Sequence, residues 1–383
     1  MAMEVDRISD FLGDQREQAP EDLQPYFLEF EDKWEKKLWH ELTEELIKFF
    51  NQPDSAPQRL ALYDTFIKSF AGKVNQLKLV TLGLKAASQI KDPQDRLKFV
   101  TTLAGRVNKP VSQDAYVHAT VEAANIHLQL EQYEEARKKL DECEKILDTF
   151  DSVETVVHAS FYGANAEYYK AKQEFASYYK NALLYLACID LSMLSVEERQ
   201  SRAYDLSIAA LVSDSIYNFG ELLLHPILDS LNNTSHAWLR ELLFAFNRGD
   251  LNAWDAQVGN LSKNKLLKAH SHFLYQKISL AALTEAVFRR PPHDRAMTFA
   301  TISEETKVKP IEIEHLIMKA LSLGLVKGQI DQVAEVARIN WVQPKVLDMK
   351  QIENMRGRLK EWDSSVNQLG NWIEGVGKDV WAA

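Results

Sequence analysis

The sequence predicts a mostly α-helical protein: a right-handed α-solenoid of helical hairpins, similar to tetratricopeptide (TPR) repeats, then a winged helix, and finally a long C-terminal helix. Three observations support this fold class. Up to about residue 280, apolar residues recur with the 3.6-residue period of amphipathic helices, and prolines fall where helices would start or stop. After residue 282 the pattern changes to short helices and two strand-like runs. From Ile352 onward it becomes an unbroken heptad.

Residues 1–180 are expected to form the repeat solenoid. Two of its segments share a pattern, because Ala124 precedes Tyr133 by nine residues and Ala166 precedes Phe175 by nine residues. In helical-hairpin repeats a small residue lets the antiparallel helix approach closely, and an aromatic residue that starts the next helix fills the gap between hairpins. The two segments match loosely, so we predict an irregular solenoid of about six helical pairs rather than a regular array.

Residues 181–281 continue as helices, and residues 282–345 have the element order of a winged helix. Prolines and glycines set the boundaries, because proline is tolerated in the first turn of a helix and glycine commonly ends one. The predicted elements are a strand at 297–299, a helix at 300–306, a helix that Pro310 opens and Gly324 ends, and two strands at 326–330 and 337–341.

Residues 346–383 are expected to form a helix that assembles with partners. Apolar residues follow in steps of three and four, the 3.5-residue period of a helix that buries a narrow seam. Four glycines each weaken the helix by about 1 kcal/mol, so we expect poor order until it packs into a bundle. Folding back on the solenoid is the alternative, but the tryptophans favour a bundle with other subunits. The seam positions are Ile352, Met355, Leu359, Trp362, Val366, Leu369, Ile373, Val376 and Val380.

The composition excludes several classes of protein. A net charge of −10 disfavours a general binder of nucleic acids or anionic membranes, which usually carries a positive patch. The chain has no run of eighteen apolar residues, and its first residues lack the basic and apolar regions of a signal peptide. Only Cys143 and Cys188 are present, in helical contexts, so we expect no disulfide. We therefore expect a protein of the cytoplasm and nucleus.

No motif indicates an enzyme, a metal or a cofactor. The nearest candidate is His40-Glu41, but a zinc protease needs a second histidine four residues after the first, and Glu44 stands there. The chain has no phosphate-binding glycine loop and no nucleophile elbow. We therefore predict no catalytic, cofactor-binding or metal-binding residues, and interpret His40 as part of a solvated helix.

The winged helix raises the question of DNA binding, since this fold often reads DNA with its third helix. Residues 281–345 contain nine Lys and Arg against eight Asp and Glu, a balance of +1. The third helix carries Glu312 and Glu314 in its first turns and only Lys319 further along. Carboxylates there would repel a DNA backbone, so we expect protein contacts.

Six segments are informative together with this order of elements: KKLWHELT (36–43), ASYYKNA (176–182), YNFGELLLHP (217–226), LFAFN (243–247), MKALSLGLVKGQID (318–331) and WVQP (341–344). With these segments, a helical solenoid that leads into a winged helix and a terminal helix resembles the PCI-domain family. Members occur in the proteasome lid, the COP9 signalosome and a translation initiation factor complex, and this chain is most similar to the subunits of the proteasome lid. One departure is Lys309, which stands where the family usually has a Ser or Thr to cap the third helix.

The resemblance implies a non-catalytic scaffold subunit of the lid, which supports assembly of the regulatory particle and ubiquitin-dependent protein degradation. Its expected partners are other PCI-domain subunits, reached through the terminal helix bundle and through the wing, where Val326 and Ile330 would meet a neighbouring sheet edge. It further implies contacts with the lid deubiquitinase pair and a ubiquitin-receptor subunit. The alternatives are a signalosome or initiation-factor subunit, or a winged-helix protein that binds nucleic acid.

Overall fold

A computed structural model describes residues 2–150, 153–232, 234–291, 294–344 and 349–381. It confirms a mainly helical chain with one small antiparallel sheet. Contacts divide the chain into two compact units, residues 1–195 and 196–383. None of the described helices is both long enough and apolar enough to cross a membrane.

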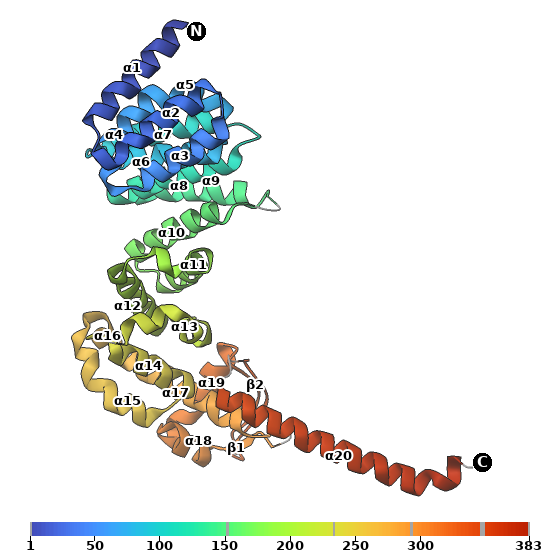
Figure 1. Ribbon diagram of the computed structural model, residues 1–383. Helices are drawn as coiled ribbons and strands as arrows, with labels where there is room; N and C mark the ends of the chain where they lie inside the picture. Colours follow the sequence, from blue (N-terminus) through green and yellow to red (C-terminus); the bar gives the residue numbers. More distant parts are fainter. Residues whose placement is uncertain (1, 151–152, 233, 292–293, 345–348, 382–383) are drawn as a thin grey trace. The chain divides into compact units, whose positions relative to one another are not determined.

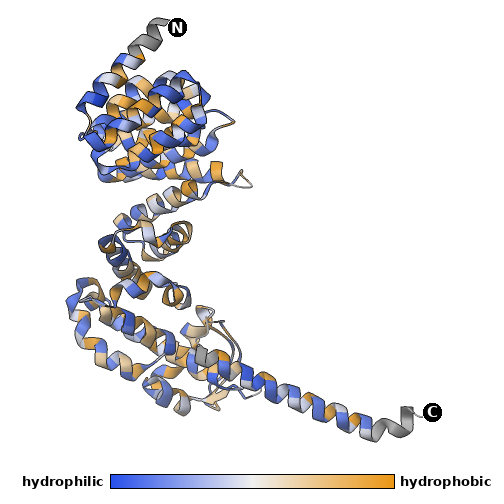
Figure 2. Ribbon diagram, viewed as in Figure 1, coloured by the Kyte–Doolittle hydropathy of each residue, from blue (hydrophilic) through white to orange (hydrophobic). Residues whose placement is uncertain are grey.

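The first unit begins with helices packed around phenylalanines. Phe27, Phe30 and Phe49 are buried and meet edge to face, with ring centroids 5.3–5.7 Å apart. Each helix also carries hydrophilic residues, as the mixed colours in Figure 2 show. The helices are α1 (Ala2–Gln18), α2 (Gln24–Glu35), α3 (Trp39–Asn51), α4 (Ala56–Ala61), α5 (Lys68–Phe70) and α6 (Gln76–Ala87) (Figure 1).

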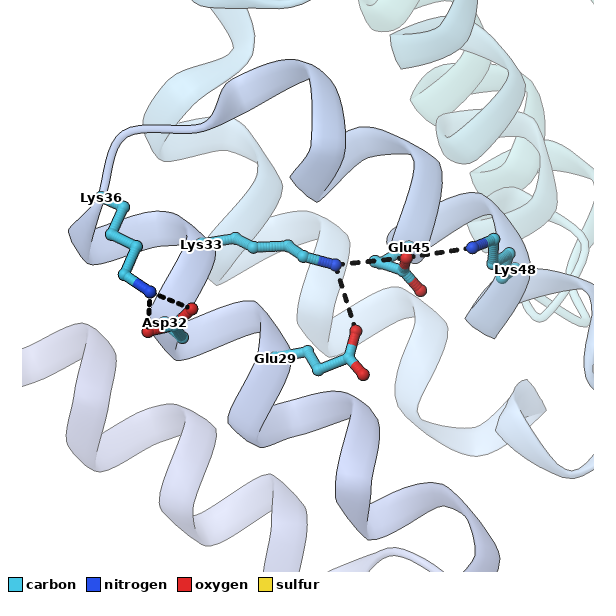
Figure 3. A network of polar contacts seen from close by, with 6 residues as sticks. All are labelled: Glu29, Asp32, Lys33, Lys36, Glu45 and Lys48. Atoms are coloured by element: carbon cyan, nitrogen blue, oxygen red, sulfur yellow. Dashed lines mark hydrogen bonds and ion pairs between the residues drawn. The ribbon is translucent and has the colours of Figure 1, made fainter.

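A charged network joins α2 to α3 (Figure 3). The Lys33 Nζ lies 3.1 Å from Glu29 Oε2 on the same helix and 3.2 Å from Glu45 Oε1 on α3. Lys48 approaches the same Glu45 oxygen at 3.0 Å. Lys33 is mostly covered, and burial opposes its charge, but the bonds to Glu29 and Glu45 outweigh burial and raise its pKa.

The rest of the first unit is a run of helical hairpins, as the repeat pattern predicted. Ala124 and Ala166 are buried, and Tyr133 and Phe175 begin the helices that follow them. The expected boundary between residues 180 and 181 falls inside the last of these helices. The helices are α7 (Pro93–Val107), α8 (Gln113–Gln129), α9 (Tyr133–Leu147), α10 (Thr155–Lys172) and α11 (Phe175–Cys188).

The second unit opens with helices held together by a buried lysine. Lys277 donates hydrogen bonds from Nζ to the carbonyl oxygens of Ala210, Leu211 and Ser213, at 2.8, 3.1 and 2.6 Å. These carbonyls lie at the C-terminal end of α12. The helices are α12 (Val196–Val212), α13 (Gly220–Leu224), α14 (Ala237–Arg248), α15 (Leu251–Gln257), α16 (Lys265–Ala269) and α17 (Ser271–Arg289).

The winged helix has the predicted order of elements. Its sheet is antiparallel with strand order β1-β3-β2, so β1 and β2 are edge strands. The β2–β3 register shifts between Lys327 and Gly328, where a Cβ would lie 2.2 Å from the Arg338 carbonyl oxygen, so only glycine fits. The elements are β1 (Ala296–Thr298), α18 (Phe299–Thr306), α19 (Pro310–Ser322), β2 (Val326–Asp331) and β3 (Val336–Val342).

The chain ends in α20 (Met349–Trp381), a single helix of 33 residues (Figure 1). At 1.5 Å per residue it is about 50 Å long. The helix is continuous through Gly357, Gly370, Gly375 and Gly377.

Candidate protein interface

The apolar seam of α20 is open to solvent along the part whose side chains the structure describes. From Ile352 to Ile373 its seam residues are 44–68% exposed, and Trp362 is the most exposed of them. A fold that covered the seam within this chain would bury these side chains. The exposed residues are Ile352, Met355, Leu359, Trp362, Val366, Leu369 and Ile373. Val376 and Val380 lie in the helix, but their side chains are outside the described part.

The surroundings of the seam fit a helix that packs against other helices. Among the described residues, a Cβ built on Gly357, Gly370 or Gly375 meets no atom within 4 Å, so none of these residues packs closely enough to require glycine there. Trp372 stands beside the seam and is 63% exposed. One contact that ties α20 to the rest of its unit is the hydrogen bond from Arg358 Nη2 to the Arg289 carbonyl oxygen, at 2.9 Å.

The side chains of the two predicted wing residues face the core of the winged helix. Val326 is fully buried in the core of the winged helix, where it packs with residues such as Ile313 and Ala337, so its side chain is not available to a partner. Ile330 is half-buried against the same core. Alternation along β2 explains this, since both residues point to the covered face of the sheet. The strand can therefore offer its backbone edge, but not these two side chains.

The outward face of α19 has the chemistry of a protein contact. Ile311 and Met318 are 83% and 53% exposed, and they lie seven residues apart on the face opposite the buried Ile313 and Ile317. Neither residue was predicted to be exposed, although the spacing of Ile311 and Met318 relative to the core positions indicates it. Lys319 donates a hydrogen bond to Gln276 at 3.2 Å.

The His40 region takes part in contacts between helices. His40 is exposed on α3, and Glu44 forms an ion pair with Lys78 on α6. The hydrogen bond from Lys78 is the main cause that holds the pKa of Glu44 below its ordinary value. Within the described residues, no three His, Cys, Asp or Glu side chains gather in a way that could hold a metal ion.

The sequence matches three family models in the order of these structural parts. "PSD13 N-terminal repeats" covers residues 26–243, "PCI domain" covers residues 256–341, and "Rpn9 C-terminal helix" covers residues 345–377. The third match includes most of α20.

Relatives agree with these matches. The "Probable 26S proteasome regulatory subunit rpn9" of Schizosaccharomyces pombe is 44% identical over 97% of both chains. The "26S proteasome non-ATPase regulatory subunit 13" of Dictyostelium discoideum is 37% identical over 89% of this chain and 90% of its own. The "Eukaryotic translation initiation factor 3 subunit M" of Emericella nidulans is only 28% identical over 45% of this chain, so the initiation-factor alternative is not favoured. The chain therefore belongs to the Rpn9/non-ATPase subunit 13 family of PCI-domain proteasome regulatory subunits.

Proposed function

We propose that this chain is a non-catalytic scaffold subunit of the lid of the 26S proteasome regulatory particle, and that it supports assembly of the particle and ubiquitin-dependent degradation. The observation that carries the proposal is the exposed seam of α20, in the segment that matches the Rpn9 C-terminal helix. An apolar stripe this long on a free surface is typical of a helix that assembles with partners.

The partners are other PCI-domain subunits. The α20 seam would enter a helix bundle, and the free edge of β2 would extend the sheet of a neighbour. The lid deubiquitinase pair and a ubiquitin-receptor subunit would lie nearby, and the protein would act in the cytoplasm and nucleus. The proposal includes no cofactor and no contact with nucleic acid or membrane.

The seam is tested by charge insertion. The double variant Leu359→Asp with Leu369→Asp places two carboxylates where the bundle would bury them, and should prevent stable entry into the lid. The matched control, Ser364→Asp with Asn371→Asp, adds the same charges at exposed positions away from the seam and should assemble normally.

Assembly is measured by co-migration with the lid on a native gel after expression in cells lacking the natural subunit. Normal entry of the seam variant would contradict the proposal. If neither variant entered the lid, added charge rather than burial of the seam would explain the result. The proposal that the seam packs into the lid would then lose its support.

A further inference from the structure

The seam of α20 carries information about the number and direction of its partner helices. We label its heptad so that Ile352 is at position a and Met355 at position d. Parallel pairs of helices favour β-branched residues at a and leucine at d. Position a is occupied by Ile352, Leu359, Val366, Ile373 and Val380, and position d by Met355, Trp362, Leu369 and Val376. Four of the five a positions are β-branched, whereas three of the four d positions are not.

Charged residues beside the seam indicate that a second copy of α20 could be the partner helix. In a parallel pair, position g of one helix lies opposite position e of the next heptad of the other helix. Arg358 is at g and Asp363 at the following e, so two copies of α20 would place each Arg358 beside Asp363 of the second copy. Both side chains are exposed. The twofold symmetry of such a pair repeats the ion pair.

The same register matches large residues with small ones. Trp372 is at g and Gly377 at the following e, so the indole of each copy would lie over a residue without a side chain. The exposed Trp372 has the space to do so. In an antiparallel pair e lies opposite e and g opposite g, so neither match would form.

We propose that the free subunit self-associates through α20, as a parallel, in-register pair that covers the seam. Arg358 already donates one hydrogen bond to the Arg289 carbonyl, but a guanidinium has five N–H groups and accommodates a carboxylate as well. This pairing is a property of the free subunit and does not depend on whether the subunit enters the lid. If the lid uses the same seam, self-pairing and assembly exclude each other, and the free pair keeps the apolar stripe covered until assembly.

The identity of the partner is tested by exchanging charges in the full-length protein. Sedimentation velocity across a range of concentrations gives the dimer dissociation constant. Arg358→Asp or Asp363→Arg alone creates two like-charge contacts and should weaken the dimer at least about tenfold. The double variant, with Arg358→Asp and Asp363→Arg, restores the pairs in reverse and should recover the wild-type constant. A wild-type chain that remains monomeric, or single variants that dimerise as wild type does, would overturn the proposal.

Direction is tested by cysteine cross-linking in a Cys188→Ala background, in which the remaining Cys143 is buried. Ile352→Cys and Ile373→Cys lie near opposite ends of the described seam, and each should form a disulfide with its own copy under mild oxidation. Ser364→Cys, on the far side of the helix, is the control and should not. Cross-links that form only in a mixture of the two seam variants would show an antiparallel pair and reject the model. This assay uses the purified subunit alone. A result that rejects self-association would therefore leave the proposed entry into the lid, which the native gel tests, unaffected.

Discussion

Lys277 supplies hydrogen-bond donors where the C-terminal end of α12 lacks them. The last carbonyl groups of a helix have no partner within the helix, and when they are buried something else must satisfy them. The ammonium group bonds to three of these carbonyls and lies 5.2–5.7 Å from the ring centroids of Tyr217, Phe219 and Phe273. One side chain on α17 therefore caps a helix 64 or more residues earlier in the sequence.

We predict that Lys277→Met destabilises the second unit by about 3 kcal/mol, because the methionine fills similar space but leaves buried carbonyls unpaired. Amide hydrogen exchange across α12 and α17 measures the loss. Ser279→Ala is a matched control, since Ser279 is buried on the same helix and its hydroxyl bonds to the Tyr275 carbonyl one turn earlier, within α17. Equal protection in Lys277→Met and wild type would show that the cap is dispensable.

The stability that Lys277 gives to the second unit should rise with pH. Burial lowers the pKa of Lys277 from its ordinary 10.5 to about 7, although Asp214 opposes the shift. Between these values the unfolded chain binds more protons than the folded chain, so this group makes stability rise with pH. The gap between wild type and Lys277→Met should therefore widen from about pH 7 toward 10.5. The neutral amine has two N–H groups, so it keeps two of the three hydrogen bonds.

Two residues with a left-handed backbone conformation end helices at positions that could not be predicted from the sequence. Glu131 and Gln173 have φ of 58° and 60° and end α8 and α10 in the same way, with the next N–H bonding to a carbonyl five residues back. They lie 42 residues apart, the spacing of the hairpin repeat. Glycine usually marks such an end, and without it neither position was predicted from sequence.

At the scale of elements, the Lys33 network fixes α2 against α3. The side chains of Lys33 and Glu45 are only 17% and 16% exposed, so water screens this pair less than the outer pairs in Figure 3. We predict that Lys33→Met lowers the local stability of α2 and α3 by about 1 kcal/mol. Lys36→Met is the control, because the Lys36–Asp32 pair is largely exposed and lies within α2, and it should change stability by less than about 0.5 kcal/mol.

The stability that Lys33 gives to α2 and α3 should be lost in acid. The hydrogen bond from Lys48 is the largest cause that lowers the pKa of Glu45 from 4.5; burial opposes it, and Lys33 adds to it. A lowered carboxyl pKa gives stability that is present above the unfolded value and lost as the pH falls through the folded one. Hydrogen exchange of α2 and α3 should separate wild type from Lys33→Met at pH 7 and less below pH 4.5. If wild type and Lys33→Met still differed in acid as much as at pH 7, packing of the Lys33 side chain rather than its ion pair would explain the stability difference.

Winged-helix elements were predictable because local signals agree with the tertiary structure. Pro310 begins α19, Gly324 follows its end in a left-handed conformation, and both wing strands lie within a residue or so of their predicted bounds. Lys309 precedes α19 without a side-chain cap, as expected. The side-chain direction along β2 was not predictable, because its short alternation does not show which face meets the core. The structure buries the Val326 side chain, and the predicted pairing of the β2 edge with a neighbouring sheet stays a prediction.

At the scale of the whole molecule, the exposure of the α20 seam separates folding from assembly. The seam residues from Ile352 to Ile373 contribute little burial within this chain, and the Arg358 bond to Arg289 is at the protein surface. We predict that deletion from Ile352 onward leaves both units folded, with amide protection of residues 2–344 unchanged apart from the end of α17. The deletion should still prevent stable entry into the lid. Loss of protection in the core of the winged helix would instead show that α20 stabilises its own unit, and the assembly defects of seam variants would then have to be attributed to misfolding.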